Sequence, residues 1–571
     1  MVDPDVLRIE NAIQKLQESA DESDLIEILL QGALNWPLAD EDDENLAIDG
    51  ISDSYDDVLV EMGFSSEDAP IELRQVMPFP NWSHGIFIVR FGSNKFFTQG
   101  RGMTTPLRTI LRELMEKVSP TADHPSWKKD QILFLCHSET EYFQFARFEV
   151  PKGDSKTSKI QMFGWGPNEH IRTVCEYNLK NLIYKDEMNE EDATKAFDSA
   201  FDVSKVSNEF YEDYRMEFEN AKQFIENNSN LTEEDDIHQA TQILFNRILF
   251  LRFIEKKKGW LQFGETDNYL EQLFKAGGID SDTSFYSSRL RRLFFEGLAV
   301  EGKGEDPAYG KVPFLSGGLF EENELDKSIN DLPDELFERL LGDGGLFYRW
   351  NFTVQESTPF DVDVAIDPEM IGTLFEELVT GRNEKGAFYT PRPVVAYMCR
   401  EAIKSVLKER TDVDTEAIRK LIDDDDNKGL SIVDARTINS VLAEVKAIDP
   451  ACGSGAYLLG LLHELVRVHT KLSTTAEDLL ESRTEMKLRI ISNSIYGVDL
   501  DRFATIQASL RLWLSISVDA TEPELMPNLD MNIIHGDSLL NDDPQWVKKY
   551  EHFDWDPDGN RARAKQISII R

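Results

Sequence analysis

The sequence Asp449-Pro450-Ala451-Cys452-Gly453-Ser454-Gly455 combines an acid with two glycines and could hold a small charged ligand. It follows an apolar run at 445–448 that predicts a short strand, and it precedes an apolar run from 456 that predicts a helix. Glycine lets the backbone approach a ligand closely, and a helix N-terminus presents N–H groups to an anionic group such as a carboxylate. This strand, loop and helix therefore predict a site for a nucleotide-like cofactor.

A second acid, Asp499, follows an apolar run at 494–498 and precedes a helical pattern at 502–516. An acid at the end of the second strand of a nucleotide-binding sheet accepts hydrogen bonds from both ribose hydroxyls. Its separation from the loop exceeds the roughly 20 residues usual in dinucleotide folds, which requires extra helix and loop between 465 and 490. The alternative is that Asp499 only caps the following helix.

Two further pairs of residues stand at the ends of predicted elements. Asp537 and Ser538 follow a strand predicted at 531–534, where the alternative is again a helix cap. Tyr389 and Thr390 belong to a Phe-Tyr-Thr-Pro sequence ahead of an apolar helix, where the alternative is an ordinary helix start. Asp449, Asp499 and Asp537 thus each follow a predicted strand, and their order along the chain strengthens the interpretation of all three.

The seven residues from Asp449 to Gly455 resemble the first motif of amino-methylating DNA methyltransferases. The resemblance implies S-adenosylmethionine as cofactor, with the turn at Gly453 and Gly455 holding its methionine portion and Asp449 near its amino group. It also implies that Asp499 binds the ribose, that Asp537 and the Ser538 backbone bind the adenine, and that Tyr389 and Thr390 contact the methionine portion. The expected cofactor-binding residues are Tyr389, Thr390, Asp449, Pro450, Ala451, Cys452, Gly453, Gly455, Asp499, Leu500, Asp537 and Ser538.

From about residue 235 onward the chain is similar to the large adenine methyltransferases of Type IIG restriction–modification enzymes and of the PglX-like group in phage defence. The segments 237–261 and 368–376 resemble the helical connector of that group. The resemblance implies an adenine-specific DNA methyltransferase, with double-stranded DNA as partner and no membrane.

The residues that would present the target base are missing from the sequence. Methylation of an adenine amine requires the base to be flipped out of the stack, and the family holds it with Asn/Asp-Pro-Pro-Tyr. The chain has no Pro-Pro dipeptide, and the nearest look-alike, Asp543-Pro544-Gln545-Trp546, lacks the second proline. No catalytic residue is therefore assigned.

Because of that missing motif, we interpret the chain as an N-terminal portion that supplies the cofactor-binding half. The catalytic motif and a target-recognition domain would come from a longer parent or from a companion chain. The alternatives are a non-catalytic subunit that binds DNA or cofactor, a truncated relic and, as a lesser reading, a protein-glutamine methyltransferase, which needs the same motif.

The elements that must position these residues predict an α/β protein. We expect an incomplete Rossmann-like methyltransferase sheet at 361–571, preceded by a helical connector at 191–360. A small α/β or α+β domain is expected at 71–190, after an acidic, partly helical and peripheral segment at 1–70. A nuclease origin of the small domain would require Glu/Asp-x-Lys on a strand, but the matches Asp154-Ser155-Lys156 and Glu444-Val445-Lys446 fall in a polar loop and in the cofactor strand.

Composition bounds these predictions. The 571 residues, 41% of them hydrophobic, indicate a multi-domain globular protein. No apolar run reaches membrane-spanning length and the start resembles no signal peptide, so we expect a cytoplasmic protein. Its four cysteines, at 136, 175, 399 and 452, lack metal-ligand or disulfide spacing and are expected to be reduced and structural.

The formal net charge of −44 argues against DNA binding, because DNA-binding proteins neutralise phosphates with Lys and Arg. One reconciliation is a halophilic source, where salt screens an acidic surface; the alternative is an ordinary acidic protein. Under either explanation, DNA binding requires a local path of basic residues. Each candidate group could equally be a solvated face. The candidates are Lys256-Lys257-Lys258, the trio Arg289, Arg291 and Arg292, and the group Arg561, Arg563 and Lys565.

Overall fold

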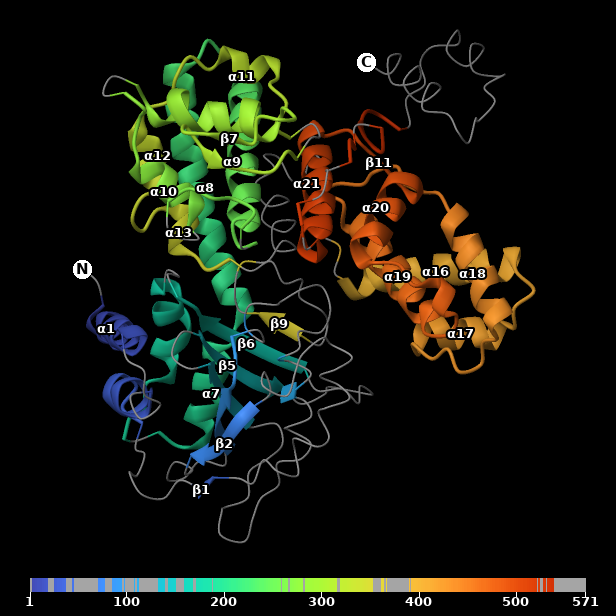
Figure 1. The fold of residues 1–571 in the computed structure, drawn as a ribbon, viewed down its shortest axis with the longest axis horizontal. Coiled ribbons are helices and arrows are strands. Elements are labelled where there is room, and N and C mark those ends of the chain that lie inside the picture. The colour runs from blue at the N-terminus through green and yellow to red at the C-terminus, as the bar shows by residue number, and fades with distance from the viewer. Residues whose placement is uncertain are drawn as a thin grey trace.

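The chain was analysed as a computed structural model (Figure 1). It describes residues 3–18, 25–36, 44–45, 70–76, 85–94, 97, 107, 110–111, 132–138, 142–149, 159–167, 171–186, 188–257, 259–264, 268–280, 283–315, 319–352, 361–363, 366, 390, 392–520, 522–523, 527–529 and 531–538. These residues form a mixed-sheet unit, a helical unit and a second α/β unit. None of the described helices is both long and apolar enough to cross a membrane.

The first unit is built on a mixed sheet with the strand order β1-β2-β3-β4-β5-β6-β9. β3 pairs with β4 and β6 with β9 in parallel, and the other neighbours are antiparallel. The apolar runs expected as strands near 86–90, 132–135 and 142–148 lie in β3, β4 and β5. The strands are β1 (Glu44–Asn45), β2 (Pro70–Val76), β3 (Gly85–Phe91), β4 (Ile132–Ser138), β5 (Tyr142–Glu149), β6 (Lys159–Trp165) and β9 (Asp361–Asp363).

The two faces of this sheet bury different sets of side chains, because successive residues of a strand point to opposite faces. In β3, Ile86 and Ile88 belong to the large core, whereas Phe87 and Val89 belong to a smaller core with Leu107 and other residues. The elements on the large-core side are α1 (Pro4–Glu18), η1 (Leu25–Ala33), η3 (Val174–Asn178), η4 (Leu179–Leu182) and α7 (Glu190–Ala200).

The first helices are fixed parts of this unit. Ile9 and Leu29 are fully buried in the large core. The indole of Trp36 donates a hydrogen bond to the Leu182 carbonyl at 2.8 Å. Residues 3–18 and 25–36 therefore contribute to the core, and the expectation of a peripheral start is wrong for them.

The boundary expected at residue 361 coincides with a strand of the first sheet. In β9, Asp361 pairs with Ile160 and Asp363 with Met162 of β6. The chain therefore returns from the helical unit to the first sheet before it enters the second α/β unit.

The helical unit surrounds α9, which is buried over most of its length. The N-cap of α9 is Glu233, whose side chain makes no capping hydrogen bond. The elements of the unit are α8 (Val203–Asn228), α9 (Glu234–Ile254), α10 (Tyr269–Lys275), η5 (Tyr286–Leu290), η6 (Leu293–Leu298), the hairpin β7 (Glu305–Asp306) and β8 (Gly310–Lys311), α11 (Glu324–Ser328), α12 (Asp334–Leu341) and α13 (Leu346–Arg349).

The second α/β unit contains the three parallel strands expected around the cofactor loop, in the order β10-β11-β12. The register places Asp449 beside Gly497 and Asp499 beside His535, so the carboxyl ends of all three strands meet at one edge. The elements are α16 (Arg392–Arg410), α17 (Thr415–Asp423), α18 (Ile432–Glu444), β10 (Ala447–Asp449), α19 (Ala456–Ser473), η7 (Glu477–Leu479), α20 (Arg483–Ser494), β11 (Ile495–Asp499), α21 (Arg502–Asp519) and β12 (Ile533–His535).

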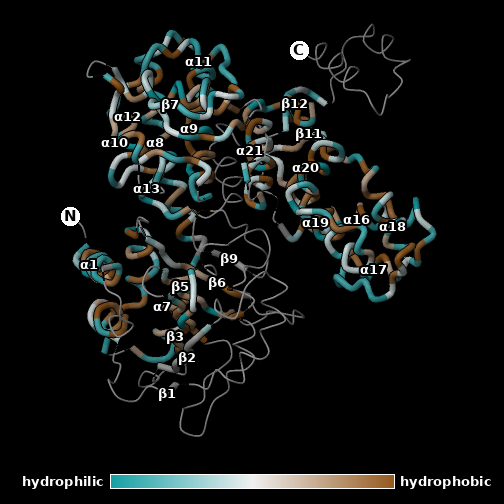
Figure 2. The backbone as a smooth tube through the Cα atoms, in the orientation of Figure 1, coloured by the Kyte–Doolittle hydropathy of each residue, from teal (hydrophilic) through white to brown (hydrophobic). Residues whose placement is uncertain are grey.

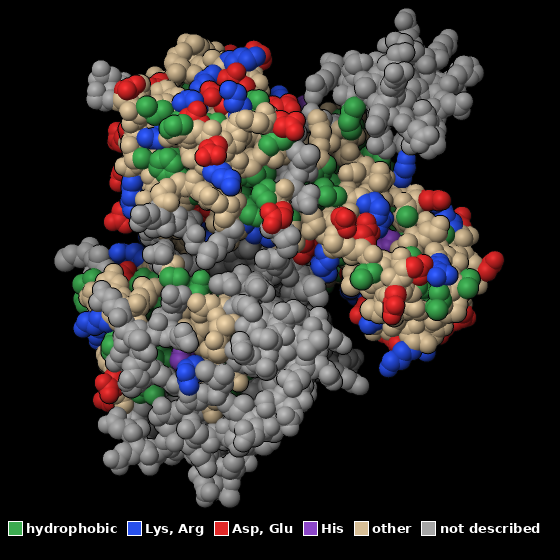
Figure 3. Space-filling view, viewed as in Figure 1, with side chains coloured by type: hydrophobic (Ala, Val, Ile, Leu, Met, Phe, Trp, Pro, Cys, Tyr) green, Lys and Arg blue, Asp and Glu red, His purple; other side chains and the backbone are tan. Residues whose placement is uncertain are grey.

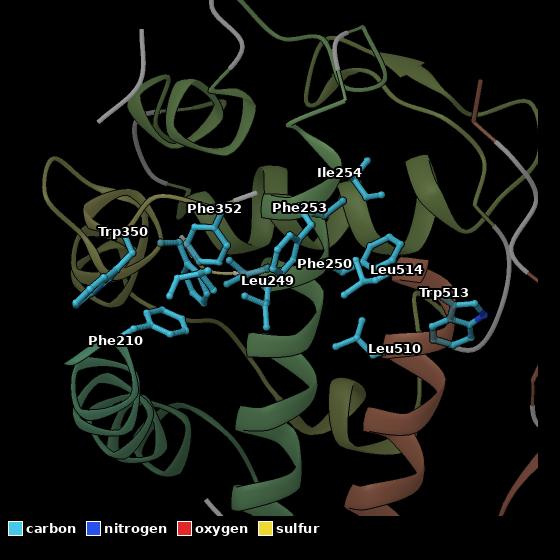
Figure 4. Close-up of a cluster of buried hydrophobic side chains, with 14 of the residues drawn as sticks. Phe210, Leu249, Phe250, Phe253, Ile254, Trp350, Phe352, Leu510, Trp513 and Leu514 are labelled. Atoms are coloured by element: carbon cyan, nitrogen blue, oxygen red, sulfur yellow. The ribbon is translucent and has the colours of Figure 1, made fainter. Parts of the chain in front are cut away.

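Helices α9 and α21 join the helical unit to the second α/β unit. Figure 4 shows Phe250 of α9 against Leu510 and Leu514 of α21, and all three belong to the large core. The Lys257 ammonium group donates hydrogen bonds to the carbonyls of Val518 and Ala520 at the end of α21. The outer helix α17 carries both hydrophilic and hydrophobic residues (Figure 2), and its hydrophobic residues Ala417, Ile418, Leu421 and Ile422 are buried.

We predict that burial of His469, on α19, makes stability depend on pH. Burial, with a contribution from Arg489, lowers the pKa of His469 to about 4 from its ordinary 6.5. Between these values the unfolded chain binds a proton that the folded chain does not. The stabilisation is therefore present above pH 6.5 and is lost as the pH falls toward 4, with a total of at most about 3 kcal/mol.

The measurement is thermal unfolding of the natural chain and of His469→Gln from about pH 7 to about pH 4. The natural chain should lose more stability on acidification than the variant. Parallel curves would show that His469 does not titrate as the structure indicates. His137, whose pKa is also lowered by burial to about 4, is present in both proteins and cancels from the difference.

Candidate cofactor site

The loop between β10 and α19 has a backbone that requires its glycines. Gly455 is the N-cap of α19 with φ of 85°, and Gly453 has φ of 52°. Both values lie in the left-handed region that disfavours L side chains. The Gly455 N–H donates to the Cys452 carbonyl, and the Cys452 N–H donates to the Val498 carbonyl of β11. The loop is therefore a tight turn anchored to the second strand.

The two glycines differ in their surroundings. A Cβ at Gly455 would lie 2.9 Å from the Ala508 Cβ and 3.1 Å from its Cα, so α21 leaves no room for a side chain there. A Cβ at Gly453 would meet nothing within 4 Å. The loop is thus closed on the side of α21 and open at Gly453, where a ligand can approach the backbone.

Asp449 carries a carboxylate oxygen that lacks a donor. Its Oδ1 accepts a hydrogen bond from the Ala451 N–H at 3.1 Å. Its Oδ2 is buried and has no hydrogen-bond partner among the described residues. Burial raises the pKa of Asp449, the bond from Ala451 acts in the opposite direction, and the carboxylate of Asp499 adds to the rise. A cationic donor placed at Oδ2 would relieve this cost.

Asp499 ties the ends of the strands together. Its Oδ2 accepts from the Gly453 N–H at 2.8 Å, and its Oδ1 accepts from the Asp501 N–H at 2.9 Å. Its backbone carbonyl accepts from the Gly536 N–H. The N-cap of α21 is Asp501, whose side chain accepts from the Phe503 N–H, so the capping alternative for Asp499 is wrong.

Other expected site residues lie at the same edge. Leu500 is exposed, and its carbonyl lies 3.0 Å from Nε2 of His535. Asp537 and Ser538 follow β12 and are exposed. Cys452 is buried, and burial followed by the charges of Asp499 and Asp449 raises its thiol pKa to about 12, as expected for a reduced packing residue. The other three cysteines, Cys136, Cys175 and Cys399, are also buried and form no disulfide.

The remaining expected residues are less informative. Pro450 and Ala451 are exposed in the loop, and Thr390 is half-buried. Tyr389 and the connector segment 368–376 lie outside the described residues.

The sequence interpretation missed three residues that shape the loop. Gly497 of β11 leaves space for the loop, since a Cβ there would lie 2.9 Å from the Cys452 sulfur. Ala508 packs against Gly455, and Arg511 donates to the Ser454 carbonyl at 2.9 Å. The available signal was an arginine inside the apolar stretch Leu-Arg-Leu-Trp-Leu at 510–514.

Two of the three basic groups contain residues that bond to other parts of the same protein. Lys257 is buried against α21, and Arg289 is buried with bonds to the Gly277 and Ala308 carbonyls. Arg291 pairs with Glu322, and Arg292 pairs with Asp306. The third group, Arg561 to Lys565, lies outside the described residues.

Lys257 and Arg289 are therefore buried packing residues, and Arg291 and Arg292 are each paired with an acid. On the face shown in Figure 3, acidic and basic side chains of the described residues are interspersed.

The nuclease tripeptide Glu444-Val445-Lys446 does not lie on the first sheet. Glu444 ends α18, and Lys446 directly precedes β10, so this match belongs to the cofactor unit. The match at 154–156 lies outside the described residues. Among the residues that the structure describes, no group of three His, Cys, Asp or Glu side chains could hold a metal ion.

The parallel strands, the glycine loop and the helix that follows form an α/β unit around a three-stranded parallel sheet. Residues 425–534 match the family described as "MmeI, DNA-methyltransferase domain". The matched segment contains the loop and Asp499, so the similarity to this DNA-methyltransferase family falls on the part of the chain that holds the candidate site.

Two curated proteins are similar to this chain in sequence. The chain is 27% identical over 426 residues to the "Putative type II restriction enzyme and methyltransferase RM.MjaORFECS2P" of Methanocaldococcus jannaschii, covering 65% of this chain and 34% of that protein. It is 23% identical over 324 residues to DNA methyltransferase A of Bacillus subtilis, covering 55% of this chain and 32% of the relative. The chain thus spans about a third of the length of these relatives.

Among solved structures, the Type IIL restriction–modification enzyme MmeI in complex with DNA aligns with a TM-score of 0.38 and 17% identity. The alignment covers 60% of this chain and 41% of that one.

We predict that Gly455→Ala destabilises the chain more than Gly453→Ala. Both place a side chain at positive φ, which costs about 1 to 2 kcal/mol. Only Gly455→Ala also drives a methyl group into Ala508 of α21, which adds about 1 to 3 kcal/mol. Denaturant unfolding of the two variants measures the difference. Equal losses would contradict the contact between the loop and α21.

Proposed function

We propose that the loop 449–455 binds S-adenosylmethionine and that the chain acts as the cofactor-binding part of an adenine-specific DNA methyltransferase. The observation that carries the proposal is that the loop has an acceptor without a donor at one end and a helix N-terminus at the other. Asp449 Oδ2 lacks a donor at one end, and the N-terminus of α19 favours an anion at the other. An ammonium and a carboxylate on one molecule, as in the methionine portion of the cofactor, suit this arrangement.

The remaining roles follow the order of the strands. Asp499 would accept hydrogen bonds from the ribose hydroxyls, since each of its oxygens has a second lone pair beyond its backbone donor. Asp537 and Ser538 would contact the adenine, and Tyr389 with Thr390 the methionine portion. Pro450, Ala451, Cys452 and Leu500 would shape the walls of the site. No metal is proposed.

When bound, the cofactor supplies an activated methyl group. The residues of this chain bind and orient the donor, and we assign none of them to the transfer itself. The target base would be held by an Asn/Asp-Pro-Pro-Tyr motif, which the sequence lacks. We therefore propose that a companion chain or a further segment supplies that motif together with target recognition.

Double-stranded DNA is the proposed substrate, within a restriction–modification or phage-defence system of the cytoplasm. The match to the MmeI methyltransferase domain and the names of the two curated relatives support DNA as the substrate class. Adenine as the target, and the PglX-like group as a nearer relation, rest on the resemblance of the motifs. The second candidate, a non-catalytic subunit or relic that binds cofactor or DNA, is favoured by the missing Pro-Pro dipeptide.

We predict that Asp449→Asn weakens binding of S-adenosylmethionine about tenfold to a hundredfold, because a charge-assisted hydrogen bond to the amino group becomes a neutral one. Isothermal titration calorimetry on the natural chain and the variant measures the effect. Asp478→Asn is the control, because Asp478 is an exposed acid of the same unit that pairs with Arg436. Undetectable binding by the natural chain, or equal binding by Asp449→Asn, would refute the proposed site.

Transfer is tested with labelled cofactor and double-stranded DNA, with and without the protein encoded downstream. We expect label in adenine when the missing motif is supplied, and none when the adenine amino groups are already methylated. If cofactor binds but DNA is never labelled, the subunit or relic alternative replaces the enzyme.

We also propose that the acidic surface reflects a salty cytoplasm. Repulsion within a chain of net charge −44 is screened by salt, so fold and cofactor binding should be lost on desalting and restored by salt. Circular dichroism during dialysis follows this change. A chain that stays folded and binds cofactor at low salt would favour an ordinary acidic protein.

A further inference from the structure

The cofactor loop rests on one face of α21. Ala508 and Arg511 are three residues apart and therefore lie on the same side of the helix. Ala508 packs against Gly455, and Arg511 reaches the neighbouring Ser454. Both of these loop residues are buried on this side, whereas Gly453 faces open space.

Arg511 holds the peptide group that opens α19. Its Nη1 donates to the Ser454 carbonyl at 2.9 Å, and the Ser454 hydroxyl lies 3.3 Å from the same nitrogen. The Ser454 carbonyl and the Gly455 N–H belong to one planar peptide unit. Fixing the carbonyl therefore fixes the direction of the N–H, which donates to Cys452 within the turn.

The helix that carries Arg511 is held in turn by the helical unit. Gln507, one turn before Arg511, donates to the Asn246 side-chain carbonyl at 2.9 Å, and both amides are fully buried. The other polar atoms, Asn246 Nδ2 and Gln507 Oε1, have no partner among the described residues. This bond lies beside the apolar contact of Phe250 with Leu510 and Leu514 (Figure 4).

We propose that Arg511 is a positioning residue that keeps the loop 449–455 in its ligand-binding shape before the cofactor arrives. Helix α21 supports the loop, and contacts with α9 of the helical unit fix the position of α21. Arg511 does not touch the ligand; it acts through Ser454 and Gly455. The effect on cofactor affinity rests on the proposed function, whereas the effect on the loop does not.

The matched control is Lys487, a buried cation of α20. Its ammonium group donates to the carbonyl and the hydroxyl of Ser515 at 2.8 Å each, which reproduces the type of bonds made by Arg511. It also pairs with Asp519. Lys487→Met therefore removes a buried cation from the same helix pair without removing any contact to the loop.

The first experiment is hydrogen exchange of the free chain. In Arg511→Met, the amides of Cys452, Gly453 and Gly455 should exchange about tenfold faster, as expected for the loss of a charged hydrogen bond. Arg511→Lys, which keeps the charge but presents a single donor group, should give an intermediate rate. In Lys487→Met, faster exchange should be confined to α20 and α21. Unchanged loop exchange in Arg511→Met would overturn the proposal.

The second experiment is calorimetry with S-adenosylmethionine. Arg511→Met should lose about tenfold to a hundredfold in affinity, Arg511→Lys less, and Lys487→Met less than about twofold at matched folded fraction. Equal affinity of Arg511→Met and the natural chain would refute the positioning role. If the natural chain binds no cofactor, the proposed function fails, and the exchange experiment still decides the role of Arg511. If Arg511→Met does not fold, Arg511→Lys decides both experiments.

Discussion

The hydrogen bond from the Gly453 N–H to the Asp499 carboxylate is the interaction on which the site depends. It joins the loop after β10 to the end of β11, and the Asp499 carbonyl extends the connection to Gly536 after β12. Three segments far apart in sequence are thereby fixed at one edge of the sheet. Because the loop is fixed by hydrogen bonds within the protein, less conformational entropy has to be lost when a ligand binds there, which leaves more of the interaction energy for binding.

The sequence was sufficient for the elements around this edge. The strands at 447–449, 495–499 and 533–535 fall within a residue or two of their expected positions, because each apolar run is bounded by glycine or by polar residues. Local chemistry could not separate a ribose-binding acid from a cap at Asp499, since both follow a strand and precede a helix. The contacts exclude the cap, because the N-cap of α21 is Asp501, and ribose binding by Asp499 stays a prediction.

Long-range partners explain the remaining errors. The partners of Lys257 and Arg289 are backbone carbonyls, which leave no trace in sequence. The packing of α1 depends on η3 and η4, more than 150 residues away, so its short amphipathic pattern could not reveal a core helix. These buried cations also sharpen the charge question. Lys257 and Arg289 are withdrawn from the surface, so neither offsets the charge of the acidic side chains there.

The pairing of β9 with β6 has a consequence for how the chain reaches its native state. The edge strand of the first sheet is synthesised only after the whole helical unit, about 200 residues later than its partner. During synthesis one edge of β6 stays unpaired until β9 has been made, and an unpaired edge can pair incorrectly with another strand. Closing so long a connection is slow, so the first sheet should be completed late, after the helical unit has folded.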